Sequence, residues 1–110
     1  MSNQIEYRHI RYFLAVAETL HFRKAAEKLY ISQPGLTRQI KNMEDDLGVK
    51  LFDRHNRKVE LTKAGEYLRK ELTRNLNELT EILDFAKLVN NGIEGNLNFG
   101  YVGSAMKKII

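Results

Sequence analysis

Two helical patterns separated by only two residues constrain the fold of this chain more than any other feature. The first pattern spans residues 22–29 and carries apolar side chains at positions i, i+3, i+4 and i+7, namely Phe22, Ala25, Ala26 and Leu29. Only Tyr30 and Ile31 separate it from a second helical pattern. Because the two alanines let another helix cross closely, this arrangement predicts a helix-turn-helix.

The second helical pattern lies in the stretch ISQPGLTRQIKNMEDDL. Ser32 is a favourable N-cap, and Pro34 costs little because the N–H groups of a first helical turn have no partner within the helix. Gly48 is a residue that commonly ends a helix. The sequence therefore predicts a helix over residues 32–47, with a core-facing stripe of Leu36, Ile40, Met43 and Leu47.

Further patterns flank this pair of helices. Residues 6–19 have a helical period and predict a first helix, whose apolar stripe is Ile10, Phe13, Leu14, Ala17 and Leu20. After Gly48, apolar Leu51, Val59 and Leu61 alternate with charged residues around a polar tip at residues 55–57, which predicts a short two-stranded ribbon. The expected fold is mainly α: a winged helix-turn-helix with a small two-stranded wing.

A long helix is predicted over residues 64–89, which contain no proline, with Thr62 as its cap. Its apolar residues follow the alternating steps of three and four of a heptad repeat, with Gly65 and Asn75 as interruptions. A domain of about 60 residues cannot cover so long a stripe, so a partner helix is expected and the chain is predicted to form a homodimer. The predicted dimerisation residues are Leu68, Leu72, Leu76, Leu79, Ile82, Leu83 and Ala86.

The charge and composition set limits on function. The net charge is +4 and the pI about 9.4, which permits a polyanionic partner without requiring one. The absence of cysteine excludes disulfides and cysteine nucleophiles, and the three histidines have no metal-like spacing. No apolar run reaches the roughly 18 residues of a membrane span. We therefore expect no cofactor, no metal site and no membrane partner.

The order of short motifs resembles a known family. AAEKL, SQPGLTRQI, MEDDLG, LFDR and LTKAG follow one another as in the N-terminal domain of LysR-type transcriptional regulators, and the match runs from about residue 6 to residue 90. The resemblance implies a winged helix-turn-helix domain at residues 1–62, a linker helix for dimerisation at 63–91, and a truncated start of an effector-binding domain at 92–110.

The family resemblance also implies partners beyond a second copy. Members bind double-stranded DNA, assemble as dimers or as tetramers when full length, and respond to a small, often acidic, metabolite in the bacterial cytoplasm at the nucleoid. In a complete C-terminal domain, Ser104 would contact the effector. His21 stands where the family commonly has a serine N-cap, so a weaker start is expected for the helix over residues 22–29.

A recognition helix places its first turns in the major groove, which gives the helix over residues 32–47 specific roles. Arg38 can pair with guanine and Gln33 with adenine, while Thr37 can meet a thymine methyl group or a phosphate. Gly35 removes bulk where the backbone approaches DNA, and the acidic run of Glu44, Asp45 and Asp46 turns the far end of the helix away from phosphates. The predicted DNA-binding residues are Ser32, Gln33, Pro34, Gly35, Thr37, Arg38, Lys41, Arg54, Arg57 and Lys58.

Several alternatives stay open at this stage. Arg38 and Lys41 also suit a solvated helix face, Arg54 could form an ion pair with Asp53 or Glu60, and the wing tip could bind nothing. A dimerisation module with nonspecific charge is one rival function. An enzyme with a phosphate cradle at GYVGSA is another, but the sequence lacks the lysine of a nucleotide-binding loop. The sequence favours a sequence-specific DNA-binding regulator without catalytic activity.

Overall fold

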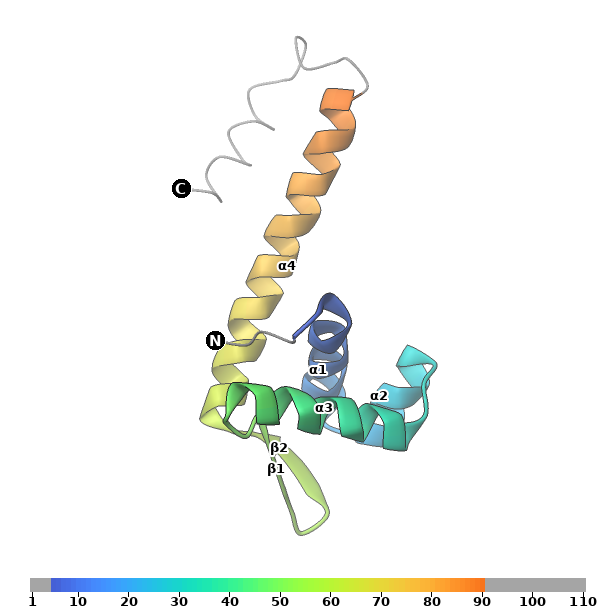
Figure 1. Cartoon of the computed structure of the whole chain (residues 1–110), viewed down its shortest axis with the longest axis vertical. Helices are drawn as coiled ribbons and strands as arrows, with labels where there is room; N and C mark the ends of the chain where they lie inside the picture. Colours follow the sequence, from blue (N-terminus) through green and yellow to red (C-terminus); the bar gives the residue numbers. More distant parts are fainter. Residues whose placement is uncertain (1–4, 91–110) are drawn as a thin grey trace. The chain divides into compact units, whose positions relative to one another are not determined.

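The computed structural model describes residues 5–90 and leaves out residues 1–4 and 91–110. The start of an effector-binding domain expected at residues 92–110, with Ser104, lies outside the described residues. The described elements are α1 (Tyr7–Thr19), α2 (Phe22–Leu29), α3 (Gln33–Leu47), β1 (Phe52–His55), β2 (Lys58–Leu61) and α4 (Lys63–Asn90) (Figure 1). The predicted fold, a mainly helical winged helix-turn-helix followed by a long helix, is confirmed.

The core forms where α1, α2 and α3 pack against one another. Ala25 and Ala26 are buried at the crossing, as their spacing predicted, and α3 contributes Leu36, Ile40 and Met43. The hairpin joins this core through Phe52, whose ring lies 5.4 Å from the ring of Phe13 and 5.8 Å from that of Phe22, centroid to centroid. The aromatic contacts thus attach the wing to the first two helices.

Left-handed residues end the first three helices. Leu20 (φ 53°), Tyr30 (φ 59°) and Gly48 (φ 76°) occupy these C-terminal cap positions. Gly48 ends α3 as predicted, whereas Leu20, named as part of the apolar stripe of the first helix, is not in the core. Leu20 lies beyond the last turn of α1 and is 41% exposed, because the chain reverses direction there.

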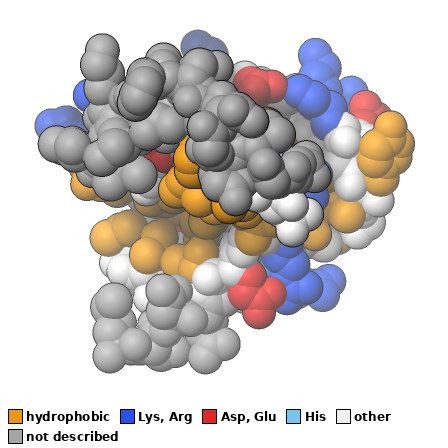
Figure 2. Space-filling model, turned by 90° about the horizontal axis from the view of Figure 1, so that it is seen from above, with side chains coloured by type: hydrophobic (Ala, Val, Ile, Leu, Met, Phe, Trp, Pro, Cys, Tyr) orange, Lys and Arg blue, Asp and Glu red, His pale blue; other side chains and the backbone are white. Residues whose placement is uncertain are grey.

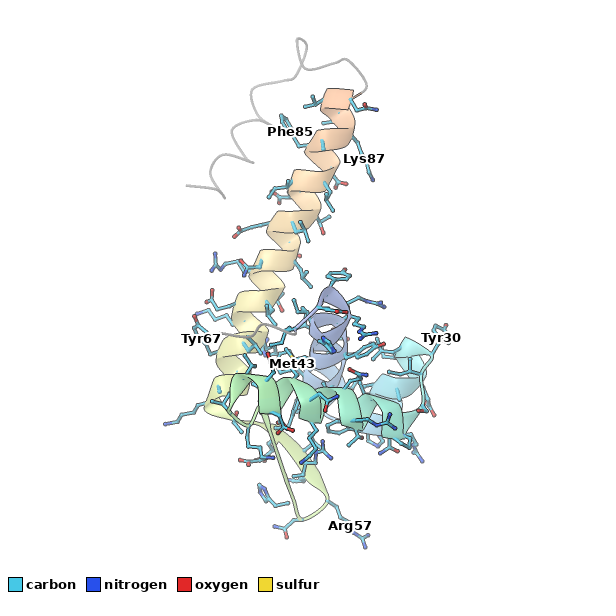
Figure 3. The ribbon with its side chains drawn as sticks, viewed as in Figure 1. Tyr30, Met43, Arg57, Tyr67, Phe85 and Lys87 are labelled. Atoms are coloured by element: carbon cyan, nitrogen blue, oxygen red, sulfur yellow. The ribbon has the colours of Figure 1, made fainter. Side chains whose placement is uncertain are left out.

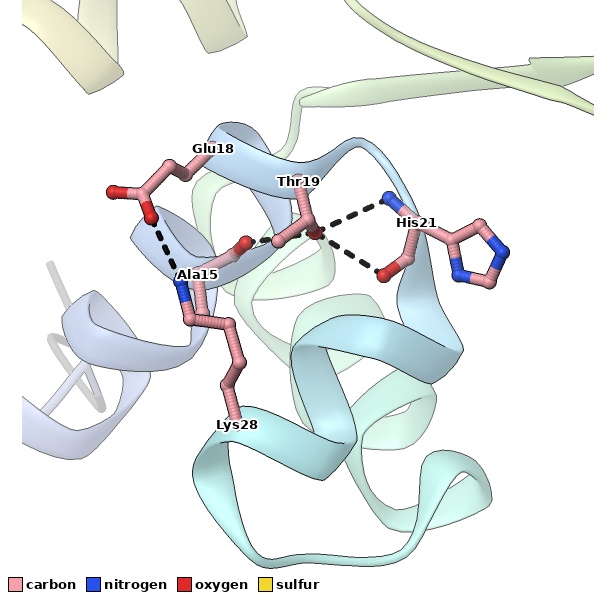
Figure 4. A network of polar contacts seen from close by, with 5 residues as sticks. All are labelled: Ala15, Glu18, Thr19, His21 and Lys28. Carbon is pink, nitrogen blue, oxygen red and sulfur yellow. Dashed lines mark hydrogen bonds and ion pairs between the residues drawn. The ribbon is translucent and has the colours of Figure 1, made fainter.

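Polar contacts fix the turn between α1 and α2 (Figure 4). The Thr19 hydroxyl can donate to the carbonyl of Ala15 (2.9 Å) or of His21 (3.1 Å), and it accepts the N–H of His21 (3.2 Å). Lys28 Nζ lies 2.9 Å from Glu18 Oε1, and its hydrogen bond and positive charge lower the pKa of Glu18. The pair is exposed, so the connection between the two helices depends mainly on packing.

The last turn of α3 differs from the prediction. Leu47 was expected in the core but is 42% exposed, and the carboxylate of Glu44, expected at an exposed acidic end, is buried instead. One oxygen of that carboxylate, Oε2, accepts the backbone N–H groups of Leu51 (2.7 Å) and Phe52 (3.2 Å). The hairpin begins at this point, so a charged residue holds it against α3.

The hairpin is a two-residue turn between antiparallel strands. Phe52 pairs with Leu61 and His55 with Lys58, so His55 belongs to β1 and the turn consists of Asn56 and Arg57 alone. Both turn residues have positive φ, at 53° and 61°, as the twist of a tight hairpin requires.

The base of the hairpin leads directly into α4. The Thr62 hydroxyl accepts the N–H of Gly65 (3.0 Å), which confirms its predicted capping role, and donates to the carbonyl of Lys50 (2.6 Å). Gly65, expected as an interruption of the heptad seam, is buried, and an added Cβ atom would overlap the carbonyl oxygen of Leu51. Glycine at this position lets α4 begin against the hairpin.

Replacing Glu44 tests the connection between α3 and the hairpin. Glu44→Ala should lower the free energy of unfolding by about 2–4 kcal/mol, because two buried N–H groups lose their acceptor. Glu44→Gln keeps an acceptor oxygen and should cost less, while Asp45→Ala, an exposed neighbour, should stay within about 0.5 kcal/mol of the parent chain. Urea denaturation followed by circular dichroism measures all three. Equal stability of Glu44→Ala and the parent would contradict this role.

Candidate nucleic-acid interface

The start of α3 is built around its N-cap. The Ser32 hydroxyl oxygen accepts the N–H of Gly35 at 3.1 Å, as the sequence predicted, and Pro34 stands in the first turn where no intrahelical N–H bond is lost. An added Cβ atom on Gly35 would lie 2.8 Å from that hydroxyl oxygen. Glycine therefore leaves room for the cap, a reason that the sequence did not indicate. Its predicted closeness to DNA stays a prediction.

One face of α3 remains open to solvent along its N-terminal half. Gln33, Pro34, Arg38 and Lys41 are exposed and Thr37 is half-buried, while Leu36 and the rest of the buried stripe face the core. The helix therefore presents guanidinium, ammonium, amide and hydroxyl groups together. Forked donors of this kind suit the edges of bases.

The arginine of β1 lies on an aromatic ring. The Arg54 guanidinium carbon is 4.0 Å from the centroid of the Phe22 ring, a cation–π contact between the wing and the first residue of α2. The sequence left open an ion pair with Asp53 or Glu60, but in the described part of the chain Arg54 is engaged by Phe22 instead. This contact holds a positive charge between α2, α3 and the hairpin.

A groove of about 840 Å³ lies between the start of α2, the start of α3 and the hairpin. Gln33, Arg54, Arg57 and Lys58 line it, so the structure brings predicted residues of the recognition helix and of the wing into one concave surface. A second groove continues past Arg54 to Thr37 and Lys41. Arg54, a residue of β1, therefore lines both grooves.

The polar residues that line the first groove but were not among the predicted DNA-binding residues are His21, Arg23, His55 and Asn56. His21 does cap α2, because its Nδ1 atom accepts the N–H of Lys24 at 3.1 Å, while the weaker start expected for this helix stays a prediction. Arg23 could have been found, because it is a basic residue on the polar face of the helix that starts beside the wing.

The wing tip carries its charges outward. Arg57 projects from the end of the hairpin (Figure 3), and both Arg57 and Lys58 are exposed. Arg57 keeps a left-handed backbone that costs a non-glycine residue about 1–2 kcal/mol. Backbone strain of this kind often occurs at functional sites.

Large hydrophobic side chains reach the surface of the described part of the chain (Figure 2). On α4, Ile82 and Leu83 are 50% and 54% exposed, and Leu79 and Ala86 are exposed as well. Leu68, Leu72 and Leu76, also predicted for dimerisation, are half-buried. Apolar residues at this spacing and exposure are typical of a helix that meets a partner.

Two searches of the described residues were negative. No three histidine, aspartate or glutamate side chains among residues 5–90 are grouped so as to hold a metal ion. Within the same range, no helix combines the length and the apolar character needed to cross a membrane.

Comparison with known proteins identifies relatives of this arrangement. Residues 7–66 match the family described as bacterial regulatory helix-turn-helix protein, lysR family. The HTH-type transcriptional regulator BudR of Klebsiella aerogenes is 43% identical over 100 residues, covering 91% of this chain and 70% of BudR. AlsR of Bacillus subtilis is 45% identical over 101 residues, covering 92% of this chain. The chain spans 33% of the length of AlsR, as it does for XapR of Escherichia coli.

Solved structures have the same fold. The BenM DBD complex with benA site 1 DNA has a TM-score of 0.77 at 40% identity, covering 80% of this chain and 99% of that one. The CbnR DBD–DNA complex has a TM-score of 0.73 at 38% identity, covering 78% and 99% of the two chains.

The strain at the wing tip predicts an unusual substitution. Arg57→Gly should raise the free energy of unfolding by roughly 0.5–1 kcal/mol, because glycine adopts a positive φ without a steric penalty. Arg57→Ala removes the same charge but keeps the penalty, and it should leave stability nearly unchanged. Thermal and urea unfolding of both variants give the comparison. A loss of stability in Arg57→Gly would show that the turn is not strained.

Proposed function

The chain belongs to the LysR family of bacterial regulatory helix-turn-helix proteins, and from this premise we propose that it is a sequence-specific DNA-binding transcriptional regulator. The observation that carries the proposal is the surface shared by α3 and the wing. Exposed hydrogen-bond donors on the first turns of α3 continue into a basic groove beside the hairpin. The similar BenM and CbnR domains were solved with DNA.

The first turns of α3 lie in the major groove and read base edges. Arg38 donates to O6 and N7 of a guanine, and Gln33 forms paired hydrogen bonds with an adenine. Thr37 contacts a thymine methyl group or a phosphate, and Lys41 a phosphate farther along. Ser32, Pro34 and Gly35 let the start of the helix approach the DNA backbone closely.

The hairpin and the last turns of α3 set the orientation on DNA. Arg54, Arg57 and Lys58 contact backbone phosphates or the edge of the minor groove beside the major groove that α3 occupies. Asp45 is exposed toward the end of α3 and repels phosphates, so contact concentrates in the N-terminal half of the helix. Glu44 is buried, so exposed Asp45 is the acidic group that faces solvent there.

Two copies of the chain bind together through α4. The 28 residues of α4 extend about 42 Å, and exposed Leu79, Ile82 and Leu83 are the centre of the dimer contact. Leu68, Leu72, Leu76 and Ala86 complete it. A dimer places two recognition helices in successive major grooves about 34 Å apart, on a site with dyad symmetry.

The remaining assignments follow from the family. Its members reported above are transcriptional regulators, and we assign no catalytic activity to this chain. Residues 1–62 act as the DNA-binding domain, 63–91 as the linker helix and 92–110 as the start of an effector-binding domain that contains Ser104. A complete protein of this kind responds to a small metabolite, often an acid, forms dimers or tetramers, and acts at the nucleoid in the bacterial cytoplasm.

Selection of bound duplexes from a random library tests the function directly. The selected duplex should have dyad symmetry and bind at least about 1,000-fold more tightly than its scramble in salt-titrated fluorescence anisotropy. Equal and steeply salt-dependent binding of both duplexes would instead identify a dimerisation module that supplies only charge.

Arg38 is expected to read one base pair. Arg38→Ala should weaken binding to the selected duplex by about 1–3 kcal/mol and relax the preference at one position, because a paired contact to guanine is lost. Binding of Arg38→Ala to duplexes varied at each position measures this. Equal weakening on every duplex would show that Arg38 contacts phosphate only.

Ile82 is expected to lie in the dimer contact. Ile82→Glu should convert the dimer to monomer, because a carboxylate would be buried against an apolar partner face. Asn77→Glu, a charged substitution at an exposed polar position of α4, serves as the control and should stay dimeric. Sedimentation equilibrium distinguishes the two states. A dimeric Ile82→Glu would place the contact elsewhere.

A further inference from the structure

We propose that His9 is a positioning residue for DNA recognition: through Gln39 it sets the rotation of α3 about its axis, and so the reach of Arg38 toward a base. The observation that carries this is a hydrogen bond in which His9 Nε2 lies 2.9 Å from Gln39 Oε1. The inference rests on the proposed function and deepens it, because it assigns part of the specificity to a residue of α1 that lines neither groove beside the wing.

Both nitrogens of the His9 ring are engaged within the fold. The backbone N–H of Glu6 donates to Nδ1 at 2.9 Å, at the N-terminus of α1. In the neutral imidazole the single ring proton therefore lies on Nε2, which donates to the side-chain oxygen of Gln39. The start of α1 thus fixes both the orientation of the ring and the tautomer that α3 meets.

Gln39 is a polar side chain of α3 that serves the fold and lies apart from the candidate interface. It is half-buried, whereas the neighbouring Arg38 is exposed. Gln39 lines a hollow of about 240 Å³ between the start of α1 and α3, and it lines neither of the two grooves beside the wing. The amide therefore connects α3 to α1.

Two hydrogen-bonded residues flank Arg38 around the axis of α3. Gln39 lies about 100° from Arg38 in one direction, and Glu44 lies about 120° from it in the other. Gln39 is bonded to His9, and Glu44 to the backbone of the hairpin. A rotation of α3 about its axis would stretch at least one of these bonds. Directional contacts weaken after small displacements, so the two bonds together support the aim of Arg38.

Two variants break the bond from opposite ends. Gln39→Met removes the acceptor but keeps a long unbranched side chain, and it leaves the bond from Glu6 at the start of α1 intact. His9→Ala removes the donor and leaves Gln39 unchanged. Asn42→Met is the matched control, because Asn42 lines the same hollow and is not the partner of His9 Nε2. Circular dichroism melting confirms that each variant remains folded.

The measurement is the discrimination at the base pair that Arg38→Ala identifies, taken as the ratio of the Kd values of the substituted and the selected duplex. One neutral hydrogen bond changes the population of a conformation by roughly fivefold, so Gln39→Met and His9→Ala should each lower this ratio by about threefold to tenfold. The double variant should lose no more than either single one, because both remove the same bond. Asn42→Met should keep the ratio of the parent chain.

Gln39→Glu distinguishes positioning from a purely structural role. Its carboxylate still accepts the Nε2–H of His9, so the discrimination should be retained. The Kd values for the selected duplex and its scramble should rise alike, because phosphates repel the added negative charge. Loss of discrimination in Gln39→Glu as large as in Gln39→Met would contradict the role of the hydrogen bond.

Two results would overturn the proposal while the proposed function stands. In the first, His9→Ala and Gln39→Met keep the ratio of the parent chain although Arg38→Ala loses it. In the second, Gln39→Met alone lowers the ratio, which would show that Gln39 contacts a base itself. If Arg38→Ala identifies no base pair, Arg38 has no base contact to be positioned and the proposal is overturned as well. A parent chain without preference for the selected duplex over its scramble would instead contradict the proposed function.

Discussion

The rest of the structure depends on one interaction at the end of α3. The buried carboxylate of Glu44 accepts hydrogen bonds from the backbone of Leu51 and Phe52. They join the last turns of α3 to the first residues of the hairpin. Both N–H groups lie where the hairpin begins and each donates to Glu44, so without this carboxylate both would lose their acceptor. Burying a carboxyl group is costly, but the hydrogen bonds from two backbone donors, at 2.7 and 3.2 Å, offset that cost. The recognition helix and the wing are thereby fixed to each other.

Once the hairpin is held at its base, aromatic contacts determine where its charges point. Phe52 packs between Phe13 and Phe22, and Phe22 in turn carries the guanidinium of Arg54 on its ring. Phe22 therefore belongs both to the core and to the candidate interface. The base of the wing is thus preorganised by these contacts, while Asn56 and Arg57, both with positive φ, form its tip. Preorganisation of this kind reduces the conformational entropy lost on binding.

Local features of the sequence predicted local structure well. Ser32 and Thr62 cap helices because a hydroxyl placed before a helical pattern meets free N–H groups whatever the surrounding fold. Residues at the ends of patterns were predicted less well. Leu20 and Leu47 continue a helical period, yet the chain reverses beyond the last turn and leaves both side chains exposed. His21 is a further case: imidazole is not a preferred cap, and its role here depends on the backbone geometry that Thr19 imposes.

The sequence by itself determined the helices, the hairpin, the motif order of the family and the polar face of α3, because these depend on periodicity and on neighbours a few residues apart. Only the tertiary structure decided the roles of Glu44, Gly65 and Arg54. Each acts on a partner in another element: Glu44 on the backbone of the hairpin, Gly65 on the carbonyl of Leu51, and Arg54 on the ring of Phe22. A sequence pattern records which side chains share a face. It contains no information on which backbone groups remain unpaired or which rings lie in reach until the elements have packed.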